Sequence, residues 1–113
     1  MRVLFVDDEP NVLDSIRRQL RKSCEVLTAT SGVEALALLK DTGPVALVIS
    51  DMRMPGMSGA ELLAKIRDLY PDTVRMILSG QADLDSTIAA INDGHIFRFL
   101  TKPCHEDALR RAV

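Results

Sequence analysis

Hydrophobic residues gather in five short runs along the chain, and longer helical patterns separate these runs. The runs cover residues 3–6, 26–29, 45–49, 74–78 and 96–100, and several are almost uninterrupted. Short, uninterrupted apolar runs are typical of parallel strands that are buried on both faces. The pattern therefore predicts a sheet of five parallel strands.

Between the runs, apolar residues recur at spacings of three and four, which gives each predicted helix one apolar stripe. The clearest stripes are Val12, Ile16 and Leu20; Leu62, Ile66 and Leu69; and Leu84, Ile88 and Ile91. Local signals mark the helix ends. These signals are Pro10 in a first turn, Ser31 with Glu34 and Ser58 with Glu61 in capping-box spacing, Asp83 before the fourth helix and Gly94 at its end.

Strands that alternate with helices through right-handed crossovers predict an α/β fold, a doubly wound three-layer α/β/α sandwich. For five strands we expect the flavodoxin-like order 2-1-3-4-5. The last predicted helix begins near Cys104 and has only about ten residues before Val113, which is short against the usual ~11 to 12. We therefore expect the chain to be cut within or just after this helix.

Composition narrows the function classes. At 113 residues and 47% hydrophobic content, residues 1–113 have room for a single domain with one core. A net charge of −2 with interspersed charges argues against direct nucleic-acid binding, and no apolar stretch approaches the ~20 residues needed to cross a membrane. Cys24 and Cys104 lack the spacing of a disulfide framework or a metal site. We expect a cytoplasmic protein with reduced thiols.

The residues that follow each predicted strand are the candidates for chemistry, because open α/β sheets bind ligands outside the carboxyl ends of their strands. They are Asp7 and Asp8, Asp51, Ser79 with Gly80, and Thr101 with Lys102 and Pro103. Taken singly, each has an ordinary interpretation as a helix cap, a turn hydroxyl or a solvated charge. Those interpretations leave their joint placement at one edge unexplained.

Three carboxylates at one edge repel one another unless a cation neutralises them. Mg²⁺ suits this need, because it prefers oxygen ligands and is usually held by one or two carboxylates together with phosphate oxygens. We expect Asp8 and Asp51 to bind Mg²⁺ directly, and Asp7 to bind it directly or through water. A carboxylate can also attack phosphorus, and Asp51 is the best-placed nucleophile. Lys102 then offers positive charge, and Ser79 a hydroxyl, to the phosphoryl oxygens.

Four segments carry a family resemblance: Asp7-Asp8-Glu9, Asp51-Met52-Arg53-Met54-Pro55-Gly56, Ser79-Gly80 and Phe99-Leu100-Thr101-Lys102-Pro103. Together they resemble the signature of response-regulator receiver domains over essentially the whole chain. The resemblance implies that Asp51 is the phosphoacceptor and that Asp7 and Asp8 form the acidic Mg²⁺ pair. It further implies that the Arg53 backbone carbonyl binds the metal and that Lys102 and Ser79 contact the phosphoryl group.

The same resemblance implies partners. The phosphodonor is expected to be a histidine of a sensor histidine kinase or of a phosphotransfer protein, and the output domain or effector lies outside this chain. Such a receiver is no enzyme in the usual sense, because it catalyses only its own phosphorylation and dephosphorylation. A weaker similarity, in residues 79–85 and 92–99, is to receivers fused to cyclic-dinucleotide phosphodiesterase (HD-GYP) domains.

Similar receivers switch through a hydroxyl shift followed by burial of an aromatic ring, which implies Ser79 and Phe99 as switch residues. Phe99 is equally explained as ordinary core on a strand. The surface of the fourth helix, fifth strand and fifth helix carries mixed charges that suit homodimer pairing or partner docking, and an ordinary solvated surface explains these charges equally well. Arg53 and Gln81 flank the expected phosphoryl position, and Arg53 either controls access of the hydrolytic water or extends into solvent.

Three other functions compete with this interpretation. A Mg²⁺-dependent phosphohydrolase of similar fold is expected to carry a second aspartate two positions after the nucleophile, where Arg53 stands instead. A phosphate-independent docking module is disfavoured by the intact acidic pair, acceptor and lysine. A nucleotide-binding flavodoxin-like protein is disfavoured because no glycine-rich phosphate loop follows the first strand.

Overall fold

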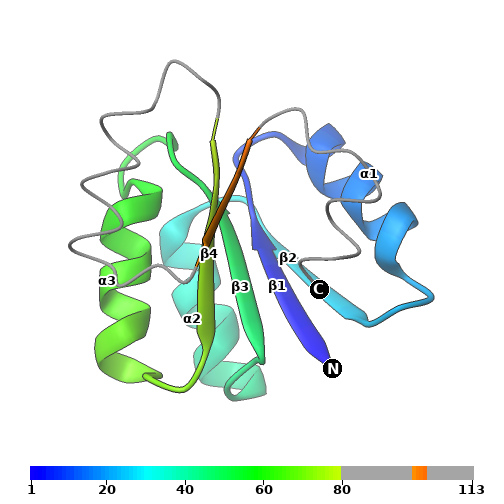
Figure 1. The fold of residues 1–113 in the computed structure, drawn as a ribbon. Helices are drawn as coiled ribbons and strands as arrows, with labels where there is room; N and C mark the ends of the chain where they lie inside the picture. The colour runs from blue at the N-terminus through cyan, green and yellow to red at the C-terminus, as the bar shows by residue number, and fades with distance from the viewer. Residues whose placement is uncertain (80–97, 102–113) are drawn as a thin grey trace.

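The computed structural model describes residues 1–79 and 98–101, which form five strands and three helices (Figure 1). The strands are β1 (Arg2–Val6), β2 (Glu25–Ala29), β3 (Leu47–Asp51), β4 (Val74–Ser79) and β5 (Arg98–Thr101), and the helices are α1 (Pro10–Leu20), α2 (Gly32–Thr42) and α3 (Gly59–Leu69). Strand and helix alternate from β1 to β4, as predicted. The predicted fourth and fifth helices, with Asp83, Gly94 and Cys104, lie outside the described residues.

All strand pairs in the sheet are parallel, and the order is β2-β1-β3-β4-β5. The predicted doubly wound topology is therefore confirmed. The central strands β1 and β3 are buried along most of their length. The edge strand β2 differs from the expectation of burial on both faces, because Glu25 is exposed and only Ala29 is fully buried.

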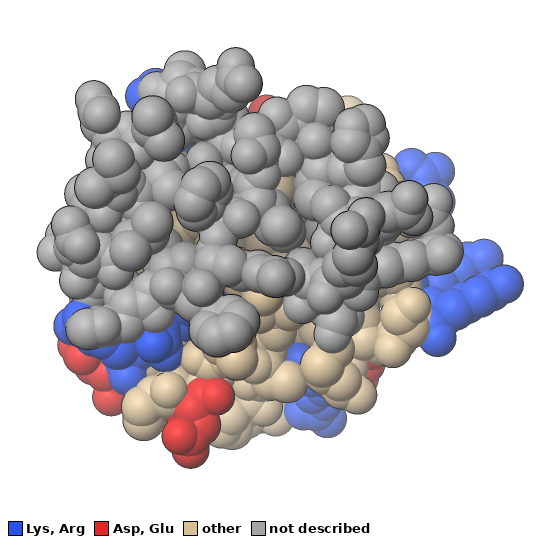
Figure 2. All heavy atoms as spheres, viewed as in Figure 1, with Lys and Arg blue, Asp and Glu red and all other residues tan. Residues whose placement is uncertain are grey.

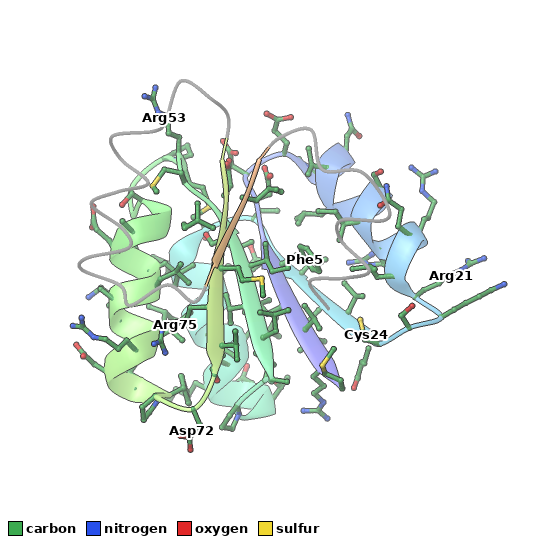
Figure 3. The ribbon with its side chains drawn as sticks, viewed as in Figure 1. Phe5, Arg21, Cys24, Arg53, Asp72 and Arg75 are labelled. Atoms are coloured by element: carbon green, nitrogen blue, oxygen red, sulfur yellow. The ribbon has the colours of Figure 1, made fainter. Side chains whose placement is uncertain are left out.

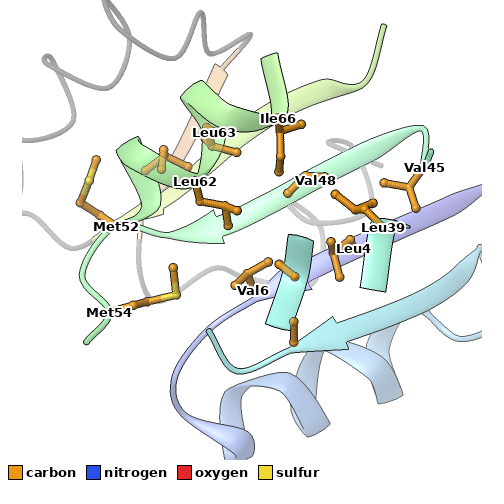
Figure 4. Packing of buried hydrophobic residues seen from close by; sticks show 13 residues of the cluster. Leu4, Val6, Leu39, Val45, Val48, Met52, Met54, Leu62, Leu63 and Ile66 are labelled. Atoms are coloured by element: carbon orange, nitrogen blue, oxygen red, sulfur yellow. The ribbon is translucent and has the colours of Figure 1, made fainter. Parts of the chain in front are cut away.

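Two apolar clusters cover the two faces of the sheet. On one face, Val3 and Phe5 of β1 pack with Leu13, Ile16 and Leu20 of α1. On the other face, the alternate residues of β1 pack with α2 and α3 (Figure 4). Figure 1 shows the same separation, with α1 on one side of the sheet and α2 and α3 on the other. The three-layer arrangement is confirmed for the described part of the chain.

The predicted helix starts are present. Pro10 is the first residue of α1. The hydroxyl of Ser31 accepts a hydrogen bond from the backbone N–H of Glu34 at 3.1 Å, and that of Ser58 accepts one from Glu61 at 3.2 Å. These bonds satisfy backbone donors that the first turn of a helix leaves without partners. Both capping predictions are confirmed.

Two details of the sequence prediction are wrong. The third strand runs from Leu47 to Asp51 instead of over residues 45–49, because Ser50 and Asp51 continue the pairing with β4 although they are polar. In α3, Leu69 is 62% exposed, whereas Leu63 is fully buried. The buried stripe of α3 is therefore centred on the Leu62–Leu63 side of the helix.

The surface shown in Figure 2 carries Lys and Arg interspersed with Asp and Glu, as far as the described residues reach. This mixture agrees with the charge pattern of the sequence. No helix within residues 1–79 and 98–101 has the length and apolar character that a bilayer crossing requires.

We predict that Leu62→Ala lowers the free energy of unfolding by about 2 to 5 kcal/mol, because it opens a cavity in the core between α3 and the sheet. Leu69→Ala on the same helix is the matched control, and it changes stability by less than about 0.5 kcal/mol because Leu69 is exposed. Urea unfolding measures both values. Equal losses in the two variants would contradict the observed packing of α3.

Candidate metal centre at the carboxyl edge of the sheet

Strand register brings the chemically interesting residues to one edge. Val6 of β1 lies beside Ser50 of β3, so Asp7 and Asp51 are the next residues on adjacent strands. Asp51 in turn lies beside Leu78 of β4, immediately before Ser79. Parallel strands with this register place their carboxyl ends together, which is where α/β sheets bind ligands.

Three carboxylates meet at this edge. Oxygens of Asp7, Asp8 and Asp51 all lie within 4.8 Å of one another. Asp7 is 2% exposed and Asp51 is 8% exposed, whereas Asp8 is open to solvent. A donor set made only of carboxylate oxygens, partly buried and open on one side, fits Mg²⁺, which keeps several waters when it binds proteins. The structure thus assembles the predicted acidic cluster.

The backbone around Asp7 fixes its orientation. Its N–H donates to the carbonyl of Ala29 at 3.1 Å, which ties the end of β1 to β2. One carboxylate oxygen of Asp7 accepts a hydrogen bond from the N–H of Glu9 at 2.9 Å. This bond turns the chain toward Pro10 and α1, so the same short turn both starts the helix and orients an acidic residue of the cluster.

Asp51 is the last residue of β3, and its main chain is held from two directions. The hydroxyl of the fully buried Ser50 donates to the Asp51 carbonyl oxygen at 2.9 Å. The N–H of Gly59 donates to the carbonyl of Met52 at 2.9 Å and closes the loop between β3 and α3. Within this loop, Gly56 has a φ of +78° directly after Pro55, a left-handed conformation that glycine adopts without a steric penalty.

Sequence reasoning overlooked Ser50 and Gly59. Each carried a signal. Ser50 is a polar residue in an otherwise apolar strand, and Gly59 occupies the first position of a helix although glycine is a poor helix former. Glycine is used where another backbone must approach closely, and a buried hydroxyl needs a hydrogen-bond partner.

Other predicted site residues are only partly placed. Ser79 ends β4 and lies beside Thr101 of β5, and Phe99 lies beside Ile77, so the backbone of both switch residues follows the predicted sheet. The side chains of Ser79 and Phe99 lie outside the described part of the structure, so their switch roles stay predictions. Gly80, Gln81 and Lys102 lie outside the described residues, and their roles stay predictions.

Arg53 follows Asp51 by two positions, and its side chain is exposed at the end of the molecule opposite Asp72 (Figure 3). It lines an open pocket of about 380 Å³ together with Met52, Met54, Pro55 and Ser58. None of the three clustered aspartates lines this pocket, so the pocket belongs to the loop between β3 and α3 and is separate from the acidic cluster. The predicted role of the Arg53 carbonyl as a metal ligand stays untested.

Comparison with known proteins decides the family. The response regulator receiver domain family matches residues 3–113. The chain belongs to this family. The hydrogenase transcriptional regulatory protein HoxA of Cupriavidus necator is 41% identical over 107 residues, which cover 95% of this chain but only 22% of HoxA. The receiver chain thus spans about a fifth of that curated relative.

Solved structures agree with this assignment. A crystal structure described as adenylate cyclase from Rhodopirellula baltica has a TM-score of 0.92 and 42% identity, and the match covers 98% of this chain and 82% of that one. The signal receiver domain of an HD domain-containing protein from Pseudomonas fluorescens Pf-5 has a TM-score of 0.91 and 37% identity, with the same coverage. Similar structures therefore come from proteins with different descriptions.

We predict that Mg²⁺ stabilises this receiver, because the ion binds only the folded arrangement of the three carboxylates. At a free concentration of 100 times Kd, it should raise the free energy of unfolding by about 2.7 kcal/mol. Asp8→Asn should raise stability by about 1 kcal/mol without metal, since it removes repulsion between close like charges. The same variant should lose most of the Mg²⁺ effect.

Thermal and urea unfolding with and without Mg²⁺ measure both effects. Asp72→Asn is the control, because Asp72 is an exposed aspartate at the opposite end of the molecule (Figure 3). An equal Mg²⁺ stabilisation of wild type and Asp8→Asn would contradict metal binding at the acidic cluster.

Proposed function

We propose that this receiver is a Mg²⁺-dependent phosphoryl acceptor, and that Asp51 takes the phosphoryl group from a phosphohistidine of a sensor kinase or phosphotransfer protein. The observation that carries the proposal is the convergence of Asp7, Asp8 and Asp51 within 4.8 Å. Asp51 is the member that ends the central strand β3, and it is nearly buried. Membership of the receiver family supplies the phosphodonor class.

In the proposed reaction, a carboxylate oxygen of Asp51 attacks phosphorus, an O–P bond forms, and the P–N bond to the donor histidine breaks. The product is an aspartyl phosphate, and the electron pair of the broken bond stays on the imidazole. Asp8 and Asp51 would hold Mg²⁺, with Asp7 and the Arg53 carbonyl completing the set. When bound, the metal offsets negative charge on the transferring group and on the carboxylates.

The remaining residues have supporting roles in this proposal. Lys102 and Ser79 would contact the phosphoryl oxygens, and Ser79 with Phe99 would pass the change on to the surface of β5. Added phosphoryl charge of roughly −1.5 to −2 is the physical driving force for this shift. Arg53 has an exposed side chain beside the acceptor, and control of hydrolytic water by that side chain stays a hypothesis.

The switch would act on an output domain or effector outside these residues, by docking or by dimerisation through the fourth helix, β5 and the fifth helix. Among the relatives, HoxA is a transcriptional regulator, and the Pseudomonas receiver comes from an HD domain-containing protein. The Pseudomonas receiver agrees with an HD-domain output, and HoxA agrees with a transcriptional output. We expect the reaction to take place in the cytoplasm.

The main alternative to a receiver function is an enzyme, a Mg²⁺-dependent phosphohydrolase that acts on a separate substrate. Its mechanism is expected to need a second aspartate at position 53, where this chain has Arg53. The proposed receiver therefore catalyses only its own phosphorylation and dephosphorylation.

We predict that wild-type protein, incubated with Mg²⁺ and acetyl phosphate, gains one phosphoryl group in intact mass spectra. Asp51→Asn should gain none, because an amide lacks the nucleophilic oxygen, while Asp72→Asn should react like wild type. No adduct on the wild type, or an undiminished adduct on Asp51→Asn, would refute the proposed function.

A further inference from the structure

Gly59 begins α3 directly against the main chain of Asp51 and Met52. A Cβ atom at this position would lie 2.2 Å from the Asp51 carbonyl oxygen and 3.0 Å from both the Asp51 carbonyl carbon and the Met52 Cα. All three are backbone atoms, which cannot rotate away as the end of a side chain can. The helix therefore approaches the candidate acceptor as closely as it does because residue 59 has no side chain.

Both partners in this contact are fixed. On the strand side, Asp51 is paired with Leu78, and its carbonyl oxygen accepts the Ser50 hydroxyl at 2.9 Å. On the helix side, Leu62, Leu63 and Ile66 are fully buried in the core between α3 and the sheet (Figure 4). Neither side is free to retreat, since close-packed cores transmit displacements instead of absorbing them.

The loop between β3 and α3 links this contact to the metal cluster. The loop starts after Asp51, at the end of β3, and ends at Gly59, the first residue of α3. The Gly59 N–H donates a hydrogen bond to the Met52 carbonyl oxygen at 2.9 Å. Displacement of the Asp51 peptide changes the direction of the Asp51 carboxylate. It also moves the backbone of Arg53, two residues further along, which is the other expected metal ligand of this loop.

We infer that Gly59 is a positioning residue of the acceptor site: its missing side chain lets α3 close over the Asp51 peptide and fixes the direction of that carboxylate. The role rests on the proposed function of Asp51. Gly59 does not need glycine for its backbone conformation, because only Gly43 and Gly56 among the described glycines have a positive φ. Glycine is needed at position 59 because any side chain would occupy the space beside the Asp51 main chain.

The chain supplies a matched control. Gly32 is likewise the first residue of an eleven-residue helix, after a serine cap and two positions before a glutamate. The three atoms nearest to a Cβ atom at Gly32 would all belong to the side chain of Met57, with Sδ at 2.7 Å, Cβ at 3.1 Å and Cγ at 3.2 Å. Methionine is flexible and adapts to such a change. Gly32→Ala thus adds the same methyl group at the same helix position without touching the Asp51 main chain.

The experiment compares wild type, Gly59→Ala and Gly32→Ala by three measurements. Calorimetric titration gives the Kd for Mg²⁺, intact mass gives the rate of phosphorylation by acetyl phosphate at saturating Mg²⁺, and urea unfolding gives stability. Gly59→Ala should weaken Mg²⁺ binding by about tenfold or more, as loss of a group that orients metal ligands does. It should also lower the saturated rate, while Gly32→Ala leaves Kd and rate unchanged.

A purely structural role of Gly59 predicts a different result, and that result would overturn the inference: lower stability with the Kd and the rate of wild type. If Gly59→Ala does not fold, Ser50→Ala becomes the test variant. It removes the hydrogen bond that holds the Asp51 carbonyl oxygen, and it adds no volume. Weaker Mg²⁺ binding by Ser50→Ala would then support the inference, and unchanged binding would overturn it. Failure of the wild type to accept a phosphoryl group would instead refute the proposed function, and the Mg²⁺ comparison would still test the role of Gly59.

Discussion

Mutual repulsion among three carboxylates is the constraint on which this end of the molecule depends. Asp7, Asp8 and Asp51 present oxygens within 4.8 Å of one another, and two of these residues are almost completely buried. Two like charges about 4 Å apart cost about 1 kcal/mol in water and about 4 kcal/mol at the effective dielectric constant of a protein surface. A fold that keeps such a cluster must hold the backbone firmly, and the cluster attracts a cation that offsets its negative charge.

The rest of the structure provides that support. The central strands β1 and β3 carry Asp7 and Asp51 from a core with apolar clusters on both faces. At the edge itself, the Glu9 N–H holds Asp7, and the Ser50 hydroxyl together with the close approach of Gly59 holds the Asp51 peptide. Apolar packing thus holds the strands in place, and a few polar and steric contacts hold the backbone that carries the carboxylates.

Much of the fold and of the acidic cluster could be predicted from the sequence. Periodicity predicts the sheet and helices, capping residues predict where α2 and α3 start, and strand-end placement predicts the acidic cluster. The errors are local. Hydropathy ended the third strand before Ser50, since it does not register the pairing of polar residues with β4. It also placed Leu69 in the core instead of Leu63, because a stripe of apolar residues does not reveal which part of a helix faces the sheet.

The contact between Gly59 and the Asp51 main chain was out of reach for a different reason. It joins a helix start to a strand end across a seven-residue loop, and no local pattern reports how closely two such elements approach. The poor helix propensity of Gly59 was the one trace of this contact in the sequence. Its meaning depends on which atoms lie opposite, which only the folded structure shows.

In the proposed reaction, the sheet edge directs a phosphoryl group to Asp51 and to no other carboxylate of the cluster. Borohydride reduction of the phosphorylated protein tests it most directly, because it converts an aspartyl phosphate to homoserine, which peptide mass spectrometry then locates. We expect homoserine at position 51, formed only when Mg²⁺ was present during phosphorylation. Homoserine at position 7 or 8, or the same yield at position 51 without Mg²⁺, would contradict it.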